Sequence, residues 1–177
     1  MLTIHEAPTH ALPPAVVRQI RTLLDAAFPG DFSDHDWAHA VGGRHVYVSG
    51  PDGVVSHGSL VERTLLCGSH RLRAGYVEAV ATAAAYRRQG HGAAVMRRIG
   101  ERIRERLPLG ALSTGTTRFY APLGWERWRG PTFVDGPAGR VRTADDDGSV
   151  MILRTAGTPA LDLDSDIVCD WRPGEVW

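Results

Sequence analysis

The sequence contains no lysine and no asparagine, so that all 20 of its basic residues are arginines. Without lysine, chemistry that uses a lysine nucleophile or a lysine Schiff base is excluded. The chain has only two cysteines, Cys67 and Cys169, among 177 residues. Two are too few for a disulfide-dense secreted scaffold, and we expect both to be free thiols in a reducing compartment.

Long apolar runs and an excess of one charge are also missing. No stretch approaches a membrane span, and the N-terminus, MLTIHEAPTH, carries two histidines and an acid where a signal peptide is apolar. The 20 acidic residues balance the 20 arginines, which leaves no global charge for a nucleic acid or a membrane surface. We expect a cytoplasmic protein that binds neither.

The balanced charge is unevenly distributed along the chain. Residues 87–129 hold ten arginines and three acids, whereas residues 130–177 hold nine acids and four arginines. The first sixty residues are also acidic, with six acids and three arginines. This pattern suggests one anionic and one cationic partner, but solvated faces of opposite charge produce the same pattern, and the sorting alone favours that second interpretation.

Apolar periodicity and turn residues predict strands and helices mixed along one domain, residues 1–177. Strands are expected at residues 2–7, 44–49, 54–66, 71–82, 109–113, 125–129 and 150–153. Helices are expected at residues 14–28, 34–41, 93–107 and 116–123, the second capped by Ser33 or Asp34. The stretch 130–148, rich in Pro, Gly and Asp, is expected to be a loop.

A glycine-rich segment, Arg87-Arg-Gln-Gly-His-Gly92, lies between a predicted strand and a predicted helix. Backbone N–H groups at such a turn converge on an anion, the helix N-terminus adds positive potential, and a diphosphate is the natural ligand. By itself the motif is weak, because most such turns only cap a helix. It is neither a Walker A loop nor the complete G-x-G-x-x-G dinucleotide fingerprint.

The spacing of this segment resembles the acyl-CoA diphosphate loop of the GNAT N-acetyltransferases, and Tyr120-Ala-Pro-Leu-Gly-Trp125 resembles their late Tyr-x-x-x-Gly-aromatic element. A resemblance to the aminoglycoside 2'-N-acetyltransferases spans nearly the whole chain. It is carried by Gly30-Asp-Phe-Ser33, Gly42-Gly-x-His45, Gly75-Tyr-Val-Glu78, Leu109-Gly-Ala-Leu-Ser113, Asp145-Asp-Asp-Gly148 and Cys169-Asp-Trp-Arg-x-Gly-x-Val-Trp177.

The resemblance implies an α/β (α+β) fold of the GNAT type, in which helices flank a mixed central sheet. It implies acetyl-CoA as cosubstrate, no metal, an aminoglycoside acceptor and a homodimer. The diphosphate would lie over Arg87, Arg88, Gln89, Gly90, His91, Gly92 and Ala93, and the pantetheine along Val80, Ala81 and Thr82. The acceptor would meet Asp31, Asp36, Glu78, Ala79, Ser113, Asp145, Asp146, Glu175 and the terminal carboxylate of Trp177.

The acidic ends of the chain would then attract a polycationic acceptor. Glu78 is the candidate general base, acting through a water, although it could be an ordinary solvent-facing strand residue. A backbone amide near Val80 would stabilise the tetrahedral intermediate. Tyr120 would protonate the leaving thiolate, or could be a buried aromatic with a satisfied hydroxyl. Direct transfer is preferred to a covalent acyl-enzyme.

Two departures from the family leave the acceptor open. The segment Ser113 to Tyr120 is shorter than in the family, and Glu175 stands where the family has Asp. The acceptor could be of the gentamicin and tobramycin type, or another 2'-amino compound such as kasugamycin. Outside this family the alternatives are a GNAT that acts on a polyamine or a protein N-terminus, and a non-catalytic acyl-CoA sensor.

Overall fold

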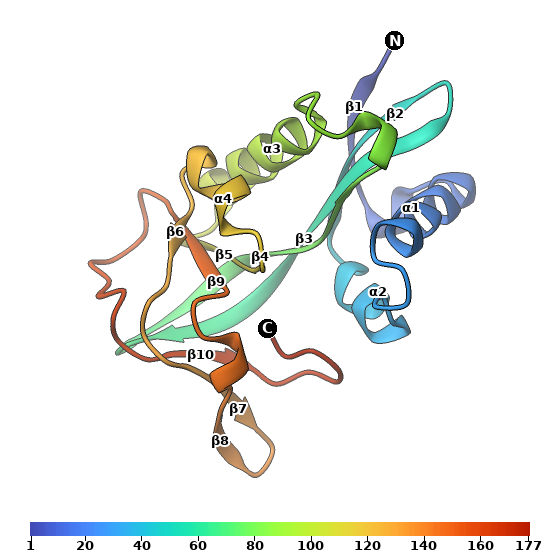
Figure 1. Ribbon diagram of the computed structural model, residues 1–177. Coiled ribbons are helices and arrows are strands. Elements are labelled where there is room, and N and C mark those ends of the chain that lie inside the picture. The colour runs from blue at the N-terminus through green and yellow to red at the C-terminus, as the bar shows by residue number, and fades with distance from the viewer. The chain divides into compact units, whose positions relative to one another are not determined.

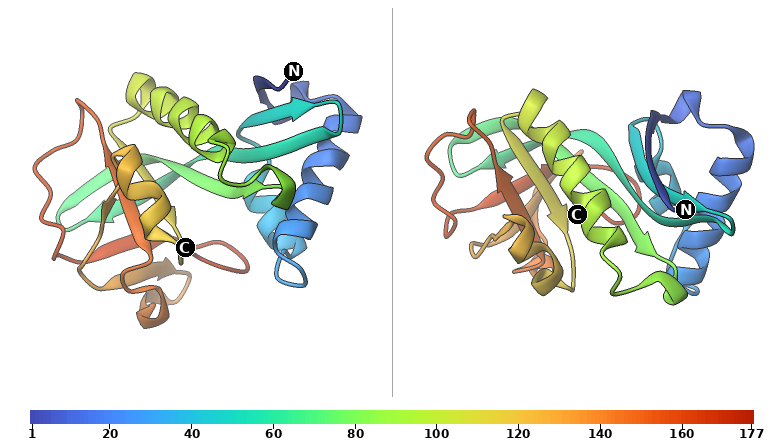
Figure 2. Two further views of the ribbon diagram at one scale, coloured as in Figure 1. Left: turned by 45° about the horizontal axis from the view of Figure 1, so that its top comes forward. Right: turned by 90° about the horizontal axis from the view of Figure 1, so that it is seen from above.

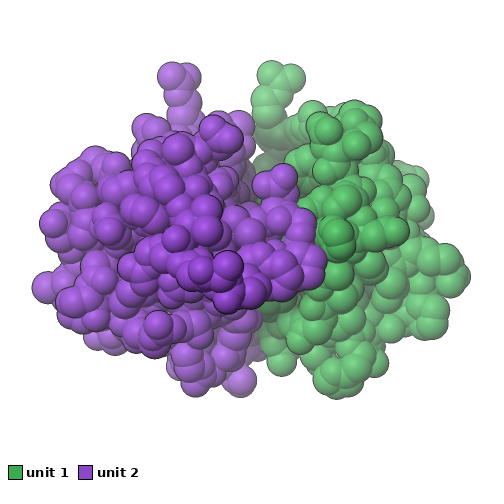
Figure 3. Space-filling view, turned by 90° about the horizontal axis from the view of Figure 1, so that it is seen from below, with its two compact units in different colours: residues 1–61, 77–99 green, residues 62–76, 100–177 purple.

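The computed structural model describes residues 1–177 and divides into two compact units. Unit 1 comprises residues 1–61 and 77–99, and unit 2 comprises residues 62–76 and 100–177 (Figure 3). Three elements contribute residues to both units: β3 (Gly53–Cys67), β4 (His70–Thr82) and α3 (His91–Arg106). None of the helices is both long enough and apolar enough to cross a membrane.

The sheet of unit 1 begins with two antiparallel pairings. β1 (Thr3–Pro8) pairs with β2 (Arg44–Gly50), and β2 pairs with the first part of β3 (Figure 1). Gly53 closes the β2–β3 turn with a φ of +93°, a value that favours glycine over residues with a side chain.

Two helices in unit 1 bury their apolar faces. α1 (Pro14–Ala27) has proline at its first turn, and its Ile20, Leu23 and Leu24 are buried in a cluster with Tyr47, Val54 and Ala81 of the strands. α2 (Asp34–Ala40) begins with a capping box between Ser33 and Asp36. Figure 2 shows both helices beside the β1–β2 strands. The two helices predicted for this region are confirmed within about a residue at each end.

Unit 2 holds a mixed sheet in the order β6-β9-β5-β4-β3-β10-β7-β8. β4 pairs with β5 and β7 with β10 in parallel, whereas the β5–β9, β6–β9, β7–β8 and β3–β10 pairs are antiparallel. The new strands are β5 (Leu109–Ser113), β6 (Glu126–Arg127), β7 (Thr132–Gly136), β8 (Gly139–Arg142), β9 (Val150–Arg154) and β10 (Ile167–Asp170). The predicted mixed sheet is confirmed.

A short helical segment follows β5 in unit 2. α4 (Thr117–Tyr120) continues into a 3-10 turn, η3 (Ala121–Leu123), and Gly124 ends it with a φ of +90°. The helix predicted over residues 116–123, closed by that glycine, is confirmed. Tyr120, its last α-helical residue, is buried.

Two predictions were wrong, and one strand was missed. Residues 130–148 are not a loop, because they hold the β7–β8 hairpin and a 3-10 turn, η4 (Ala144–Asp146) (Figure 1). All of β8 is exposed, so it has no apolar alternation that a sequence pattern could reveal. β10 was not anticipated, and the strand predicted at residues 125–129 is reduced to the two residues of β6.

Candidate active site

Strand β4 is distorted at Ala79, which has a φ of +53°. Ala79 and Arg88, with a φ of +60°, are the two non-glycine residues of the chain with positive φ. This backbone conformation costs a residue with a side chain on the order of 1–2 kcal/mol, so contacts with the surrounding structure must stabilise it. Both residues belong to the segment that was predicted to contact the acceptor and the coenzyme.

Polar side chains of β3 hold the distorted backbone of β4 in unit 1. His57 Nδ1 donates to the Ala79 carbonyl oxygen at 2.8 Å. Ser56 Oγ donates to the Ala81 carbonyl oxygen at 3.2 Å and lies 2.9 Å from Thr82 Oγ1. Ser59 Oγ donates to the carbonyl oxygen of residue 78 at 3.4 Å. The backbone over the predicted contact residues 78–82 is therefore fixed by side chains as well as by strand pairing.

Glu78 immediately precedes the distortion. Its side chain is half-buried, and it follows the buried Val77 on β4. Val80 is also half-buried, and Ala81 is buried. The residue proposed as general base therefore lies two positions before the residue whose amide is proposed as oxyanion donor.

The predicted diphosphate loop forms the start of α3. The first intrahelical bond there runs from Ala94 N to Gly90 O at 2.9 Å, so the N–H groups of the preceding turn are not used within the helix. Gly90, with a φ of +87°, has open space where a side chain would stand. The Nε2 atom of His91 is buried without a hydrogen-bond partner. Unused donors, open space and a buried polar atom fit an anionic ligand such as a diphosphate.

The side chains just before these donors shape the loop itself. Arg87 Nε donates to the Thr82 carbonyl oxygen at 3.1 Å, and Gln89 Nε2 donates to the Ala85 carbonyl oxygen at 2.9 Å. Arg87 and Arg88 are exposed. Arg87 and Thr82 also line a cavity of about 490 Å³, whose other wall is α1. The cavity gives open space beside the end of β4 within unit 1.

The two acidic residues predicted near the α1–α2 connection differ in their surroundings. Asp31 is exposed, and its backbone N–H donates to the Phe28 carbonyl oxygen. The Asp36 carboxylate instead accepts from Ser33 N and from Ser33 Oγ, each at 2.8 Å, as part of the α2 cap. The Asp36 carboxylate therefore caps α2, whereas acceptor binding by Asp31 and Asp36 stays a prediction.

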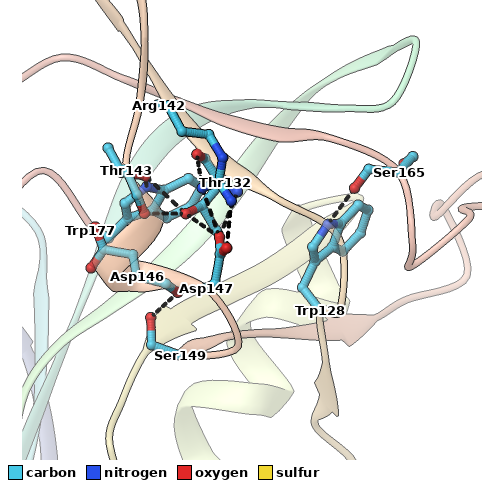
Figure 4. A network of polar contacts seen from close by, with 9 residues as sticks. All are labelled: Trp128, Thr132, Arg142, Thr143, Asp146, Asp147, Ser149, Ser165 and Trp177. Carbon is cyan, nitrogen blue, oxygen red and sulfur yellow. Dashed lines mark hydrogen bonds and ion pairs between the residues drawn. The ribbon is translucent and has the colours of Figure 1, made fainter.

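In unit 2, three consecutive aspartates fall into two classes. Asp147 binds Arg142 through both carboxylate oxygens and accepts from Thr132, and the Arg142 hydrogen bond is the main reason that its pKa is lowered to about 2 (Figure 4). The pKa of Asp146 is raised, first by burial and then by repulsion from Glu175 and Asp145. Asp145 is exposed. Two uncompensated carboxylates therefore lie beside a compensated one, and Glu175 is close enough to repel them.

The C-terminal tail is anchored. The Trp177 side chain is 7% exposed, and its Nε1 donates to Thr143 Oγ1 at 3.0 Å (Figure 4). The Trp177 main-chain oxygen accepts from Arg172 Nη2 at 3.3 Å. The buried Arg63 donates to the Val176 carbonyl oxygen at 2.7 Å and to the Asp170 carbonyl oxygen at 2.6 Å. A frayed tail, the alternative to an ordered terminal carboxylate, is excluded.

Two further predicted residues of unit 2 lie near the end of β5. Ser113 is half-buried, with its Oγ 2.9 Å from Ser149 Oγ. Tyr120 is buried, and burial raises its pKa to about 12, against the opposing effect of a hydrogen bond with Thr114. Tyr120 therefore keeps its proton at neutral pH and could act only as an acid.

Neither cysteine is suited to covalent catalysis. Cys67 and Cys169 are buried free thiols, and burial raises their pKa values to about 12 and about 11. Both thiols are protonated at neutral pH, and the thiolate is the nucleophilic form. The structure also has no group of three or more His, Cys, Asp or Glu placed to hold a metal ion.

Several residues that build these regions carry no recognisable sequence signal. His57 lies outside every motif, and Arg63 is one arginine among 20. The hydroxyl of Thr143 and the guanidinium of Arg142, the partner of Asp147, fall in the stretch that was expected to be a loop. Only a three-dimensional arrangement reveals what these side chains hold.

Comparisons with known proteins agree with the resemblance. The family model described as "Acetyltransferase (GNAT) domain" matches residues 10–128. An aminoglycoside 2'-N-acetyltransferase of Mycolicibacterium fortuitum is 44% identical over 162 residues, which cover 89% of this chain and 83% of that protein.

Solved structures show the same fold at low sequence identity. A GNAT family N-acetyltransferase, YhbS, of Escherichia coli in complex with CoA has a TM-score of 0.67 at 14% identity, covering 95% of this chain and 89% of that one. The ribosomal-protein-S18-alanine N-acetyltransferase of Escherichia coli has a TM-score of 0.60 at 14% identity, with 90% and 96% covered. A GCN5-related N-acetyltransferase of Kribbella flavida has a TM-score of 0.59 at 24% identity, and this chain spans 34% of that one.

Proposed function

Because the chain belongs to the aminoglycoside 2'-N-acetyltransferases, within the GNAT acetyltransferases, we propose that it acetylates the 2'-amino group of an aminoglycoside. As a GNAT acetyltransferase it uses acetyl-CoA as the acetyl donor. The observation that carries the choice of acceptor is the 44% identity to the Mycolicibacterium fortuitum enzyme over 89% of the chain. Acetylation would remove a positive charge with which the drug binds RNA phosphates, and so confer resistance.

The donor is bound, in this proposal, by the segment from Val80 to Ala93. The unused N–H groups at the start of α3 receive the diphosphate, and Arg87 and Arg88 supply positive charge. The backbone of Val80, Ala81 and Thr82 lies along the pantetheine. The orphaned Nε2 of His91 and the open space at Gly90 support this assignment.

The transfer itself needs a neutral amine, a stabilised oxyanion and a protonated leaving group. Glu78 accepts a proton from the ammonium group through a water, and the amine nitrogen then attacks the thioester carbonyl. The Val80 N–H donates to the developing oxyanion. When the C–S bond breaks, Tyr120 protonates the thiolate, a role supported by the pKa of about 12 that keeps its hydroxyl protonated. The second proton of the amine nitrogen, lost as the amide forms, then restores the Tyr120 hydroxyl through solvent. No covalent acyl-enzyme is involved.

The acceptor is bound by acidic groups. The family resemblance assigns Asp31, Asp36 and the backbone at Ala79 to this role in unit 1. In unit 2 it assigns Ser113, Asp145, Asp146, Glu175 and the Trp177 carboxylate. The raised pKa of Asp146 supports the assignment, because burial and then repulsion from Glu175 and Asp145 disfavour its ionised form, and a bound cation would favour it. Asp147 is excluded from this set, since Arg142 neutralises it.

The finer points remain predictions. Kasugamycin is an alternative to acceptors of the gentamicin and tobramycin type, and a GNAT acting on another small amine or polyamine is the alternative function. We also expect a single domain over residues 1–177, a homodimer and a cytoplasmic location. Light scattering at two protein concentrations tests the homodimer, and a mass of one chain at both would contradict it.

Mass spectrometry of the products tests the acceptor. The protein and acetyl-CoA are incubated separately with tobramycin, gentamicin, kasugamycin, spermidine and an aminoglycoside with a hydroxyl group at the 2' position. We expect one added acetyl group on at least one 2'-amino compound and none on the 2'-hydroxy compound. Acetylation of spermidine alone would favour the alternative, and release of CoA without an acetylated amine would contradict both.

A further inference from the structure

Two buried histidines link the distorted residue of β4 to a distant loop of unit 1. His57 Nδ1 lies 2.8 Å from the Ala79 carbonyl oxygen, and His57 Nε2 lies 2.9 Å from His45 Nδ1. His45 Nε2 in turn lies 2.8 Å from Thr9 Oγ1, which accepts from Gly42 N at 3.0 Å. Both imidazole rings are completely buried. We call this series of hydrogen bonds the histidine chain.

The last acceptor of the histidine chain, the Ala79 carbonyl oxygen, determines which nitrogen of each ring carries a hydrogen. A carbonyl oxygen only accepts, so His57 Nδ1 must carry a hydrogen. In a neutral ring the other nitrogen is then an acceptor, and His45 Nδ1 must donate to it. His45 Nε2 is left as an acceptor, so the one hydroxyl proton of Thr9 goes to it at 2.8 Å and not to the Gly43 carbonyl oxygen at 3.3 Å. Both rings are therefore Nδ1–H tautomers, and the donors point in one direction, from Gly42 to Ala79.

Burial supports this assignment, because it keeps both rings neutral. It lowers the pKa of His45 to about 4. It also lowers the pKa of His57 to about 3, with a smaller contribution from repulsion by His45. At neutral pH neither ring takes up a second proton, so each ring keeps its Nδ1–H tautomer. The histidine chain is a permanent structural feature and not a pH sensor.

We propose that His57 and His45 are positioning residues for acetyl transfer, which orient the Val80 N–H by holding the Ala79 carbonyl group. The Ala79 carbonyl and the Val80 N–H belong to one peptide group, which is planar and trans. Its C=O and N–H bonds point in opposite directions. When His57 binds the oxygen, the Val80 N–H must point away from His57. Rotation of this peptide group would break the hydrogen bond and turn the oxyanion donor away.

The inference rests on the proposed function, since it gives the Val80 N–H a thioester carbonyl to bind. It also accounts for the φ of +53° at Ala79, which is strained unless a partner compensates for it. The buried His57 ring is that partner. Gly42, in the turn before β2, and His45, on β2, therefore contribute to the site through hydrogen bonds, without contact with a substrate.

Substitution of His57 separates positioning from simple packing. His57→Leu removes the donor, whereas His57→Asn keeps an amide N–H near the place of Nδ1. We expect H57L to lower kcat at least about ten-fold, because loss of one oxyanion donor costs about 10²–10³-fold. KM for acetyl-CoA should change less than about three-fold, as the diphosphate donors are elsewhere. H57N should recover most of kcat, although it breaks the link to His45.

Val46→Ala in β2 is the matched control for packing, because Val46 is buried in unit 1 and its side chain has no hydrogen-bond donor to lose. It should lower the thermal midpoint and leave kcat unchanged. Equal kcat values for H57L and the wild type would overturn the proposal. So would equal losses in H57L and H57N, because the donor would then not matter.

Nitrogen-15 NMR of labelled histidine tests the histidine chain without any substitution or activity. Two of the eight histidines should be Nδ1–H tautomers at neutral pH, with nuclear Overhauser contacts between their rings. An Nε2–H tautomer at either ring would overturn the assigned direction. If the wild type acetylates no amine, the proposed function fails on its own. The histidine chain is then judged by the tautomers and by the shift of the Val80 amide in H57L.

Discussion

The two units hold their proposed site residues by different kinds of hydrogen bond. In unit 1 the contacts to β4 are neutral and buried, from His57 and the serines of β3 to main-chain carbonyls. In unit 2 the contacts are charged, from Arg63 to the tail and from Arg142 to Asp147. Neutral bonds fix the direction of a backbone group without adding charge. In unit 2, Arg63 and Arg142 are already paired with Asp170 and Asp147. The neighbouring Asp145 and Asp146 therefore keep their negative charge for a cationic acceptor.

This difference predicts which kinetic constant each unit controls. A change in unit 1 that disturbs the peptide group or the base should lower kcat, since these groups act in the transition state. A change in unit 2 that disturbs the tail or the acidic cluster should raise KM for the acceptor. The effects on stability should also differ, because ion pairs weaken in salt, whereas the buried neutral histidines lose stability as the pH falls below their ordinary pKa of 6.5.

Glu78→Gln should have the largest effect. The amide cannot accept a proton at neutral pH, so kcat should fall by about 10²–10⁴-fold, the usual contribution of a general base. Binding of acetyl-CoA, measured by calorimetry, should remain. Glu62→Gln on β3 is the control, since Glu62 is exposed and pairs with Arg73 at the surface. A non-catalytic acyl-CoA sensor would show no turnover in wild type or variant.

Arg63→Met should have the next largest effect and should act on the acceptor. Arg63 is 6% exposed, and its guanidinium binds two main-chain oxygens and the Asp170 carboxylate. Its loss should release the tail, raise KM for the acceptor by about ten-fold and lower the free energy of unfolding by about 2–4 kcal/mol. Steady-state kinetics and urea unfolding measure the two effects.

The exposed Arg73 supplies the control for that substitution. Arg73→Met removes an arginine that binds only a surface carboxylate, and it should change the free energy of unfolding by less than about 1 kcal/mol. A fall in kcat without a change in KM for the acceptor in R63M would contradict the division between the units.

The sequence was sufficient to predict the elements that have a local sequence pattern. The capping box of α2, the apolar stripe of α1 and the glycine after η3 each leave a local pattern, and all three are present. β8 has no such pattern because both of its faces are exposed, and β10 is a short strand whose parallel partner, β7, lies in the supposed loop.

The same reasoning applies to the candidate site. The loop Arg87–Gly92 could be recognised because its glycines and arginines adjoin in the chain. His45 and His57 are 12 residues apart and lie in separate strands, so their contact depends on the β2–β3 register. Arg63 and Val176 are 113 residues apart. Spacing alone cannot distinguish the anchored Asp147 from Asp146, because the difference arises from the partners that the fold supplies.

Asp147→Asn should remove a contribution to stability that depends on pH. The folded-state pKa of Asp147 is lowered from 3.8 to about 2, mainly by Arg142, so its stabilisation is present above 3.8 and is lost as pH falls toward 2. The urea midpoint of D147N should therefore be lower than that of the wild type at neutral pH, and the gap should close in that acidic range. Asp164→Asn, which removes an exposed pair with Arg129, should show a smaller gap that salt abolishes.

Asp146→Asn should have the smallest effect on stability, and with the opposite sign. The pKa of Asp146 is raised in the folded state, so its ionised form opposes folding at neutral pH, and this cost disappears once the pH falls below the ordinary value of 3.8. D146N should therefore unfold at a slightly higher urea concentration than the wild type at neutral pH. Its KM for the acceptor should nevertheless rise severalfold, as expected for one lost charge pair of on the order of 0.2–1 kcal/mol.

Asp146 and Asp147 are adjacent in the chain, and together they test the difference between a carboxylate that stabilises the fold and one that binds a ligand. A carboxylate that serves the fold should be costly to remove, whereas one kept for a cationic ligand should be stabilising to remove and costly only for binding. If D146N lowers both the urea midpoint and the affinity for the acceptor, Asp146 supports the fold as Asp147 does. If D146N raises the midpoint and leaves KM unchanged, the acidic cluster does not bind the acceptor, and unit 2 influences the reaction only through the anchored tail.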